Sequence, residues 1–139
     1  HLGARFAVES AGFGPAGFAA TPESVRLLTS VGVDASHHRS RVLTAAMVTD
    51  ADVVLCAERQ HVMAVVANFG GRFDRTFTLP EYAAGAGATA ARSSGMAYLH
   101  SVVPEVDDPA GRSPSTWTRV WSDLSGWCAA ASARLAGAS

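Results

Sequence analysis

One apolar run constrains the fold of this chain more than any other feature. Residues 52–57 read Asp-Val-Val-Leu-Cys-Ala, and after the aspartate no polar residue interrupts them. A continuous run of this length is typical of a strand that is covered on both faces, as in parallel sheets flanked by helices. We therefore predict an α/β domain with a parallel sheet between two layers of helices.

Further strands and helices alternate around this run. Thr21 caps a helix that Pro22 opens and Gly32 ends, and Pro80 stops a later strand. We predict strands at 5–10, 52–57 and 75–79, and helices at 22–31, 44–50, 58–69 and 96–103, with a last helix that Ser115 or Thr116 caps and that runs to Leu135. Residues 83–95, nearly all Ala, Gly, Thr and Ser, are predicted to be a flexible insertion in a single domain spanning 1–139.

Charge and cysteine content exclude several classes of protein. The formal net charge is -1, which gives no long-range attraction to nucleic acid or to an anionic membrane. No apolar run approaches the 18 residues or so of a membrane span. Cys56 and Cys128 make no disulfide framework, so we predict a cytoplasmic protein. We expect no cofactor.

Three motifs are weak when they are read in context. Gly12 to Gly17 matches Gly-x-Gly-x-x-Gly, but the helix begins too late for the glycines to open it onto a pyrophosphate, which leaves a dinucleotide site as an alternative. Cys128 and Arg134 have phosphatase-loop spacing inside a helix, where no free amides cradle an anion. His37, His38 and His61 lack the partners of a metal site, and we predict no metal.

Two adjacent carboxylates are the best candidates for chemistry. Asp107 and Asp108 precede Pro109, which keeps Asp108 out of the helical region, and Gly111 allows a tight turn. An acid held in this way can present a proton to a leaving group. The same pattern is also an ordinary loop and helix-stop signal. In a parallel sheet the loops after Ser10, Ala57, Leu79 and Val106 would all lie at the carboxyl edge, where sites form.

Several blocks together resemble the bacterial low-molecular-weight protein tyrosine phosphatases, in the order of that family and over nearly the whole chain. The blocks are Ser10-Ala11-Gly12, Gly32-Val33-Asp34 with His38-Arg39-Ser40-Arg41, Ala51-Asp52-Val53-Val54-Leu55 with His61, Phe77-Thr78-Leu79-Pro80-Glu81-Tyr82, and Asp108-Pro109-x-Gly111. The resemblance implies that Asp108 is the general acid, with Asp107 as a fallback. Ala110 stands where many members carry an aromatic residue that packs against the substrate.

The Cys-x5-Arg loop that defines this family has no counterpart here. His1-Leu2-Gly3 resembles the end of the helix that follows that loop. We therefore expect the first, inner strand of the family's four-stranded sheet to be missing from the chain. Upstream residues, a strand from another chain in a homodimer, or closure of the remaining strands would then fill the gap, because unpaired buried backbone groups are costly.

The resemblance implies hydrolysis of phosphomonoesters through a phosphocysteine, with a phosphoprotein or a small phosphomonoester as substrate. We expect the 139-residue chain to be inactive by itself, because the nucleophile loop is absent. The alternatives are a non-catalytic pseudo-phosphatase that binds or regulates a partner, and a dinucleotide-binding domain.

Overall fold

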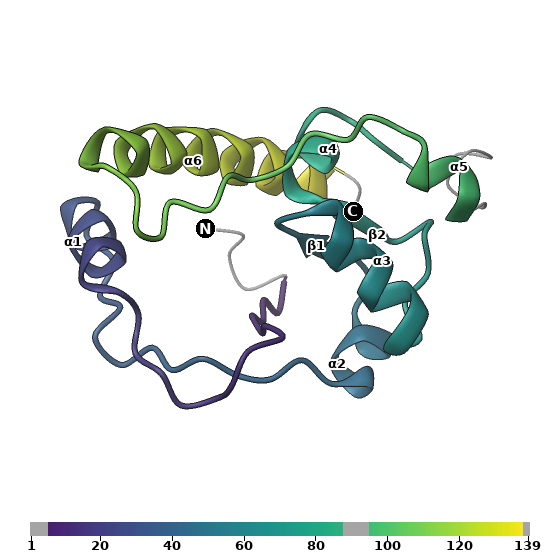
Figure 1. Cartoon of the computed structure of the whole chain (residues 1–139), viewed down its shortest axis with the longest axis horizontal. Helices are drawn as coiled ribbons and strands as arrows, with labels where there is room; N and C mark the ends of the chain where they lie inside the picture. The colour runs from purple at the N-terminus through teal and green to yellow at the C-terminus, as the bar shows by residue number, and fades with distance from the viewer. Residues whose placement is uncertain (1–5, 88–94, 138–139) are drawn as a thin grey trace. The chain divides into compact units, whose positions relative to one another are not determined.

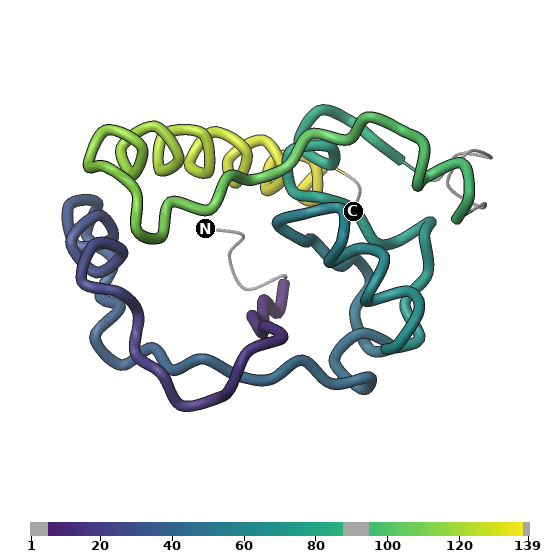
Figure 2. The backbone as a smooth tube through the Cα atoms, viewed as in Figure 1, coloured from purple at the N-terminus to yellow at the C-terminus, as the bar shows by residue number. Residues whose placement is uncertain are grey.

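The computed structural model describes residues 6–87 and 95–137 of the 139. These form two compact units, a smaller one within Gly3–Leu43 and a larger one within Thr44–Ser139, and each is described by itself (Figures 1 and 2). No helix in the described ranges is both long and apolar enough to cross a bilayer.

Over its described residues, 6–43, the smaller unit contains one helix and a single parallel bridge. The helix α1, Pro22–Ser30, starts at the predicted cap, where the Thr21 side chain accepts a hydrogen bond from the amide of Ser24. The strand predicted at 5–10 is wrong over residues 6–10, which have no ladder, and Val8 is 76% exposed. A strand exists only where a neighbour binds its amides and carbonyls, and here the neighbour reaches only Gly12, which bridges to Val42.

The larger unit is built on a short parallel sheet. Its elements are α2, Ala45–Asp50; β1, Val54–Cys56; α3, Arg59–Asn68; β2, Thr76–Thr78; α4, Leu79–Ala83; α5, Gly95–Leu99; and α6, Pro114–Gly137. The strands pair in register, with Val54 opposite Thr76 and Cys56 opposite Thr78. The helix α3 connects them, so β1–α3–β2 is a parallel crossover unit.

The predicted α/β class is confirmed, but the predicted sheet is larger than the observed one. Within the described residues the sheet has two strands, β1 and β2, instead of the three predicted for this chain, because residues 6–10 do not join it. The run 52–57 is also less covered than predicted, since Leu55 at its centre is 37% exposed. A side chain of a strand is buried where another element covers its face of the sheet, so the face that carries Leu55 is only partly covered by the described residues.

The core joins α3, β2, α4 and α6. Val62 and Val65 of α3 are almost completely buried. Phe77, Tyr82 and Ala131 form a buried cluster, against which four partly buried side chains pack: Val53, Leu79, Ala86 and Leu135. The helix α6 thus rests on the sheet through its C-terminal half. Residues 83–87 of the predicted insertion belong to this packed region through Ala86, and residues 88–94 lie outside the described ranges.

Two helix starts differ from the predictions. Pro80 does not simply stop a strand, because it lies in the first turn of α4, where Thr78 and Glu81 form a reciprocal capping box. The last helix starts at Pro114, and Ser113 caps it, because its hydroxyl accepts a hydrogen bond from the amide of Thr116 at 3.3 Å. The predicted caps Ser115 and Thr116 are therefore already helical.

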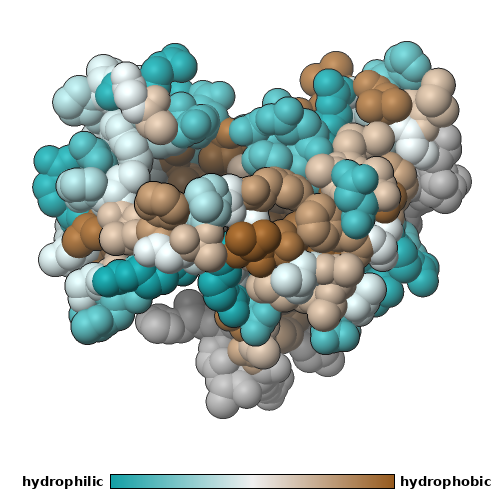
Figure 3. All heavy atoms as spheres, turned by 60° about the horizontal axis from the view of Figure 1, so that its bottom comes forward, coloured by the Kyte–Doolittle hydropathy of each residue, from teal (hydrophilic) through white to brown (hydrophobic). Residues whose placement is uncertain are grey.

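Apolar side chains also reach the surface of the larger unit, which Figure 3 shows in part. Besides Leu55, the exposed large ones are Met96, Leu99 and Val102, in and just after α5. The segment that follows α5 is therefore not held by a buried apolar core of its own, and polar contacts must position it.

Candidate functional site

The candidate site is the loop with the two adjacent carboxylates, and it is anchored at the carboxyl ends of both strands. Thr78 ends β2, and its hydroxyl donates a hydrogen bond to the carbonyl of Pro104 over 2.7 Å. Ala57 follows β1, and its carbonyl accepts from the amide of Val106 over 2.9 Å. The segment that leaves α5 can be followed past α4 to the start of α6 in Figure 1. Parallel topology thus brings together the predicted loops after Ala57 and Val106 beside the end of β2, where the helix α4 follows in place of the loop predicted after Leu79.

Glu105 contacts a third element between these two anchor points. Its Oε1 accepts a hydrogen bond of 2.7 Å from the backbone amide of Arg59, the first residue of α3. Sequence reasoning did not identify Glu105. The two residues lie 46 positions apart, and a lone glutamate before a loop matches no motif and no helical or strand period.

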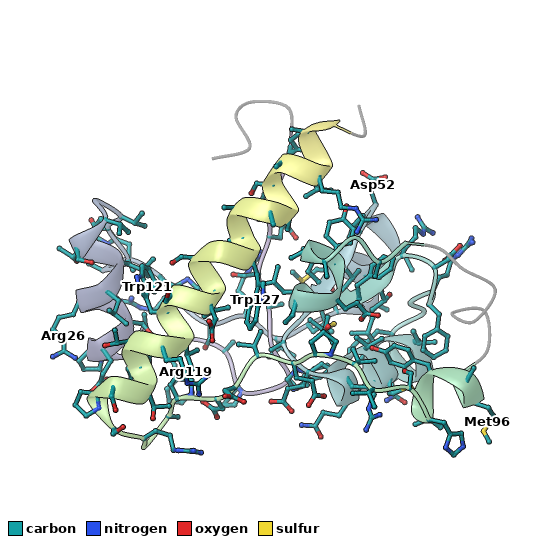
Figure 4. The ribbon with its side chains drawn as sticks, turned by 90° about the horizontal axis from the view of Figure 1, so that it is seen from above. Arg26, Asp52, Met96, Arg119, Trp121 and Trp127 are labelled. Carbon is teal, nitrogen blue, oxygen red and sulfur yellow. The ribbon has the colours of Figure 1, made fainter. Side chains whose placement is uncertain are left out.

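Asp107 is held by the last helix. Its Oδ2 accepts a hydrogen bond of 2.7 Å from Nη2 of Arg119 on α6, and Nη1 of Arg119 reaches Asp123 at 3.4 Å (Figure 4). The hydrogen bond to Asp107 raises the pKa of the Arg119 guanidinium. Both side chains of the Asp107 pair are more than half exposed, so the pair orients the loop and contributes little to stability.

Asp108 makes no hydrogen bond to another element within the part of the chain that the structure describes. Its Oδ1 accepts from the amide of Ala110 over 2.9 Å, which closes a turn around Pro109. Gly111 follows at a φ of +69°, a conformation that glycine adopts without strain. Among the residues that the structure describes, Asp108 Oδ2 has no hydrogen-bond partner. The loop therefore holds the Asp108 carboxylate through Oδ1 and leaves Oδ2 available.

The surroundings of both cysteines disfavour the thiolate form. Cys56 is buried at the end of β1, and burial, with a smaller effect from the charge of Glu81, raises its pKa to about 12. Cys128 is exposed on α6, and partial desolvation raises its pKa. Arg134, which follows Cys128 after five intervening residues, donates to the carbonyl of Tyr82 at 2.7 Å and lies 4.2 Å from the centre of its ring. The Cys128–Arg134 spacing therefore belongs to helix packing, as predicted.

The glycine-rich segment of the smaller unit does not form an anion cradle. The amide of Gly17 donates to the carbonyl of Ser40, that of Phe18 to the Ser40 hydroxyl, and that of Gly12 to the carbonyl of Arg41. A phosphate cradle requires successive free amides at a helix start, and α1 begins only at Pro22. These contacts argue against the dinucleotide alternative.

The histidines do not form part of a metal site within the described residues. His37 and His38 are exposed in the loop after α1, and His61 lies on α3. Over residues 6–87 and 95–137, no three His, Cys, Asp or Glu side chains are grouped as a metal site requires.

Comparison with known proteins gives consistent matches. A family model described as low molecular weight phosphotyrosine protein phosphatase matches residues 1–136. The protein-arginine-phosphatase of Bacillus subtilis (strain 168) is 38% identical over 66 residues, which are 48% of this chain and 43% of that protein. This alignment thus spans less than half the length of the relative.

Solved structures agree in fold. A low molecular weight protein tyrosine phosphatase from T. tengcongensis has a TM-score of 0.68 and 27% identity, covering 88% of this chain and 73% of that one. The YwlE arginine phosphatase from Geobacillus stearothermophilus has a TM-score of 0.73 at 23% identity, covering 91% and 72%, and at that identity it supports the fold alone.

Proposed function

Because this chain belongs to the low molecular weight phosphotyrosine protein phosphatase family, we propose that it carries the acid loop of a protein phosphatase and that Asp108 is the general acid. The observation that carries this proposal is the contrast between the two carboxylates. Arg119 occupies the Oδ2 atom of Asp107, whereas Asp108 has its Oδ1 fixed by Ala110 and its other oxygen directed to no described partner.

The proposed reaction has two steps. A thiolate attacks the phosphorus, a P–S bond forms as the bond to the leaving group breaks, and Asp108 gives its proton to the leaving atom. Water then attacks the phosphocysteine while the Asp108 carboxylate takes a proton from it, so inorganic phosphate leaves and the thiolate returns. Asp107 is the fallback acid if its pair with Arg119 opens.

In the proposed reaction neither cysteine of these 139 residues supplies the thiolate. Cys56 is buried with its pKa raised to about 12, and Cys128 lies in the middle of a helix whose amides are already bonded. We therefore propose that the chain by itself does not hydrolyse phosphate esters, and that the family's Cys-x5-Arg loop lies elsewhere in the natural protein.

The substrate that we propose is a phosphorylated side chain of a protein, with phosphoarginine favoured over phosphotyrosine. The similarity to a protein-arginine-phosphatase supports this order. The loop itself also supports it, because residues 104–113 contain no aromatic side chain that could stack on a phenol ring, and Ala110 follows the Asp-Pro pair. Matched peptides that carry either modification would rank the two substrates.

Two conservative substitutions in the full-length natural protein test the acid assignment. Asp108→Asn removes the proton donor and keeps the shape, and we expect kcat to fall by about 10²–10⁴. Asp107→Asn keeps an oxygen that accepts from Arg119, and we expect a change of less than about tenfold. Equal losses in the two variants, or a larger loss in Asp107→Asn, would contradict the assignment.

A second candidate function is a non-catalytic domain that keeps the phosphatase scaffold, and the unsuitable cysteines favour it. The intact mass and the N-terminal peptide of the natural protein distinguish the two. A Cys-x5-Arg segment in that protein together with turnover of p-nitrophenyl phosphate supports the enzyme. A natural protein without such a segment, or without turnover, supports the scaffold.

A further inference from the structure

The loop before Asp108 is held by four consecutive residues, each bound to a different element. Pro104 binds the end of β2, Val106 binds the residue after β1, and Asp107 binds α6. Glu105 binds the first amide of α3 over 2.7 Å. The contacts of Pro104 and Val106 fix the loop to strand ends, and that of Asp107 is an exposed ion pair with a helix. Only the contact of Glu105 places a carboxylate on a backbone amide.

Glu105 acts as the cap that α3 does not supply for itself. The residue at the cap position, Glu58, makes no side-chain hydrogen bond to the helix amides, and its carboxylate contacts Gln60 instead. A carboxylate at the start of a helix is favoured by the unpaired amides and by the helix dipole, by about 0.3–1 kcal/mol. The start of α3 and the acid loop therefore stabilise each other.

Arg59 extends this contact to the segment that leads into the loop. Its Nη1 donates to the carbonyl of Ser101 over 2.9 Å and to the carbonyl of Leu99 over 3.2 Å. The same residue thus fixes the chain at 99–101 with its side chain and at Glu105 with its amide. Between these points Val102 is fully exposed, so this segment is held by the hydrogen bonds of Arg59 and not by the packing of Val102.

The surroundings leave the contact open to water. Arg59 and Glu105 line a hollow of about 510 Å³, together with Glu58, Gln60, Met63 and Leu99. A loop that is fixed by a few polar bonds beside open solvent moves when one of them is removed. Asp108 lies three residues after Glu105, so that movement would reach its carboxylate.

We propose that Glu105 is a positioning residue, which holds Asp108 at the distance needed for proton transfer by binding the start of α3. This inference rests on the proposed function, since it concerns the acid of that reaction. Proton transfer requires contact at hydrogen-bond distance, and a displacement of about 1 Å can cost about 10² in rate.

The test compares Glu105→Ala, Glu105→Gln and Glu58→Ala in the full-length natural protein. The readout is kcat/KM for aryl phosphates of increasing leaving-group pKa, because a poor leaving group depends most on the acid. We expect Glu105→Ala to lose at least tenfold more with the poorest leaving group than with p-nitrophenol. Glu105→Gln, which still accepts from Arg59, should stay within about threefold of wild type at both ends, and Glu58→Ala should match wild type.

Amide hydrogen exchange on the 139-residue chain tests the anchor without any activity. We expect faster exchange at Arg59 and Val106 in Glu105→Ala and wild-type exchange in Glu58→Ala. Unchanged exchange at both amides overturns the anchor. Faster amide exchange in Glu105→Ala together with an equal loss of kcat/KM for all leaving groups would mean that Glu105 has only a structural role, and would overturn the positioning role. A wild-type protein that hydrolyses no phosphate ester overturns the proposed function, and the positioning role with it, while the exchange result still decides the anchor.

Discussion

Thr78→Val tests how strongly the sheet holds the acid loop. Thr78 is completely buried at the end of β2. Its hydroxyl donates to the carbonyl of Pro104 over 2.7 Å and accepts from the amide of Glu81 at 3.4 Å, as the cap of α4. Valine has nearly the same shape and fits a strand at least as well, so the substitution removes these two hydrogen bonds and little else.

The expected loss follows from the two bonds. The short bond to Pro104 accounts for about 1–1.5 kcal/mol of net stability, and the long capping bond for about 0.5–1 kcal/mol. We therefore expect Thr78→Val to lower the free energy of unfolding by about 2 kcal/mol. Thr78→Ser is the matched control, because it keeps the hydroxyl and loses one buried methyl group, at a cost of about 1 kcal/mol.

Urea unfolding followed by tryptophan fluorescence measures both variants. All three tryptophans of the chain lie on α6, two of them labelled in Figure 4, so the signal reports on the unit that contains Thr78. Amide exchange at Val106 should also accelerate in Thr78→Val and not in Thr78→Ser. If the valine variant were as stable as the serine variant, the hydroxyl would not hold the loop and the reasoning would be wrong.

Three further predictions concern packing, the accessibility of the cysteines and the pH dependence of stability. In Gly71→Ala a Cβ would lie 2.6 Å from Cγ1 and 3.0 Å from the carbonyl oxygen of Val65, so we expect a loss of about 1–3 kcal/mol in urea unfolding, whereas Gly126→Ala, in open space within α6, should gain about 0.5–1 kcal/mol. Losses of equal size at both sites would contradict this packing. A thiol reagent should label Cys128 in the native chain and Cys56 only after unfolding, and rapid labelling of both would refute the burial of Cys56. Because folding raises the pKa of Cys56 from its ordinary value of 9.0 to about 12, its contribution to stability is complete below pH 9 and is lost as the pH rises toward 12, a loss that Cys56→Ala should lack in pH-dependent unfolding.

Capping residues in the sequence predict helix starts, because the hydrogen bonds of a cap join residues that are close in the sequence. Thr21 with Pro22 predicted the start of α1, because a cap bonds amides only three residues away, and the helix predicted at 44–50 is observed as α2, which Thr44 caps. The helix α4 carried the same kind of signal in Thr78-Leu79-Pro80-Glu81, a capping-box pattern that the presence of Pro80 obscured. That helix could have been found from the sequence.

Elements that depend on distant partners could not be predicted in the same way. Residues 6–10 alternate like a strand, but alternation shows only which side chains can face a core, and pairing requires a neighbour in space. The edge at which the loops meet did follow from parallel topology. The hydrogen bond from the backbone amide of Arg59 to Glu105 did not, because nothing in the sequence reveals that a carboxylate accepts from an amide 46 residues away.

The two adjacent aspartates show how identical side chains acquire different roles within one loop. From the sequence they differ only in that Asp108 precedes proline, which fixes its backbone and allows its Oδ1 to accept from Ala110. The helix that starts soon afterwards then brings Arg119 to Asp107, twelve positions away, and this pair directs one carboxylate along α6. A carboxylate bound to a guanidinium orients the loop, whereas one that is fixed through a single oxygen keeps the other for the proton transfer that we propose. The difference between the contacts of Asp107 and Asp108 therefore depends on α6 as much as on the Asp-Pro pair. Arg119→Gln should change the placement of the loop through Asp107 and leave the turn at Asp108 intact.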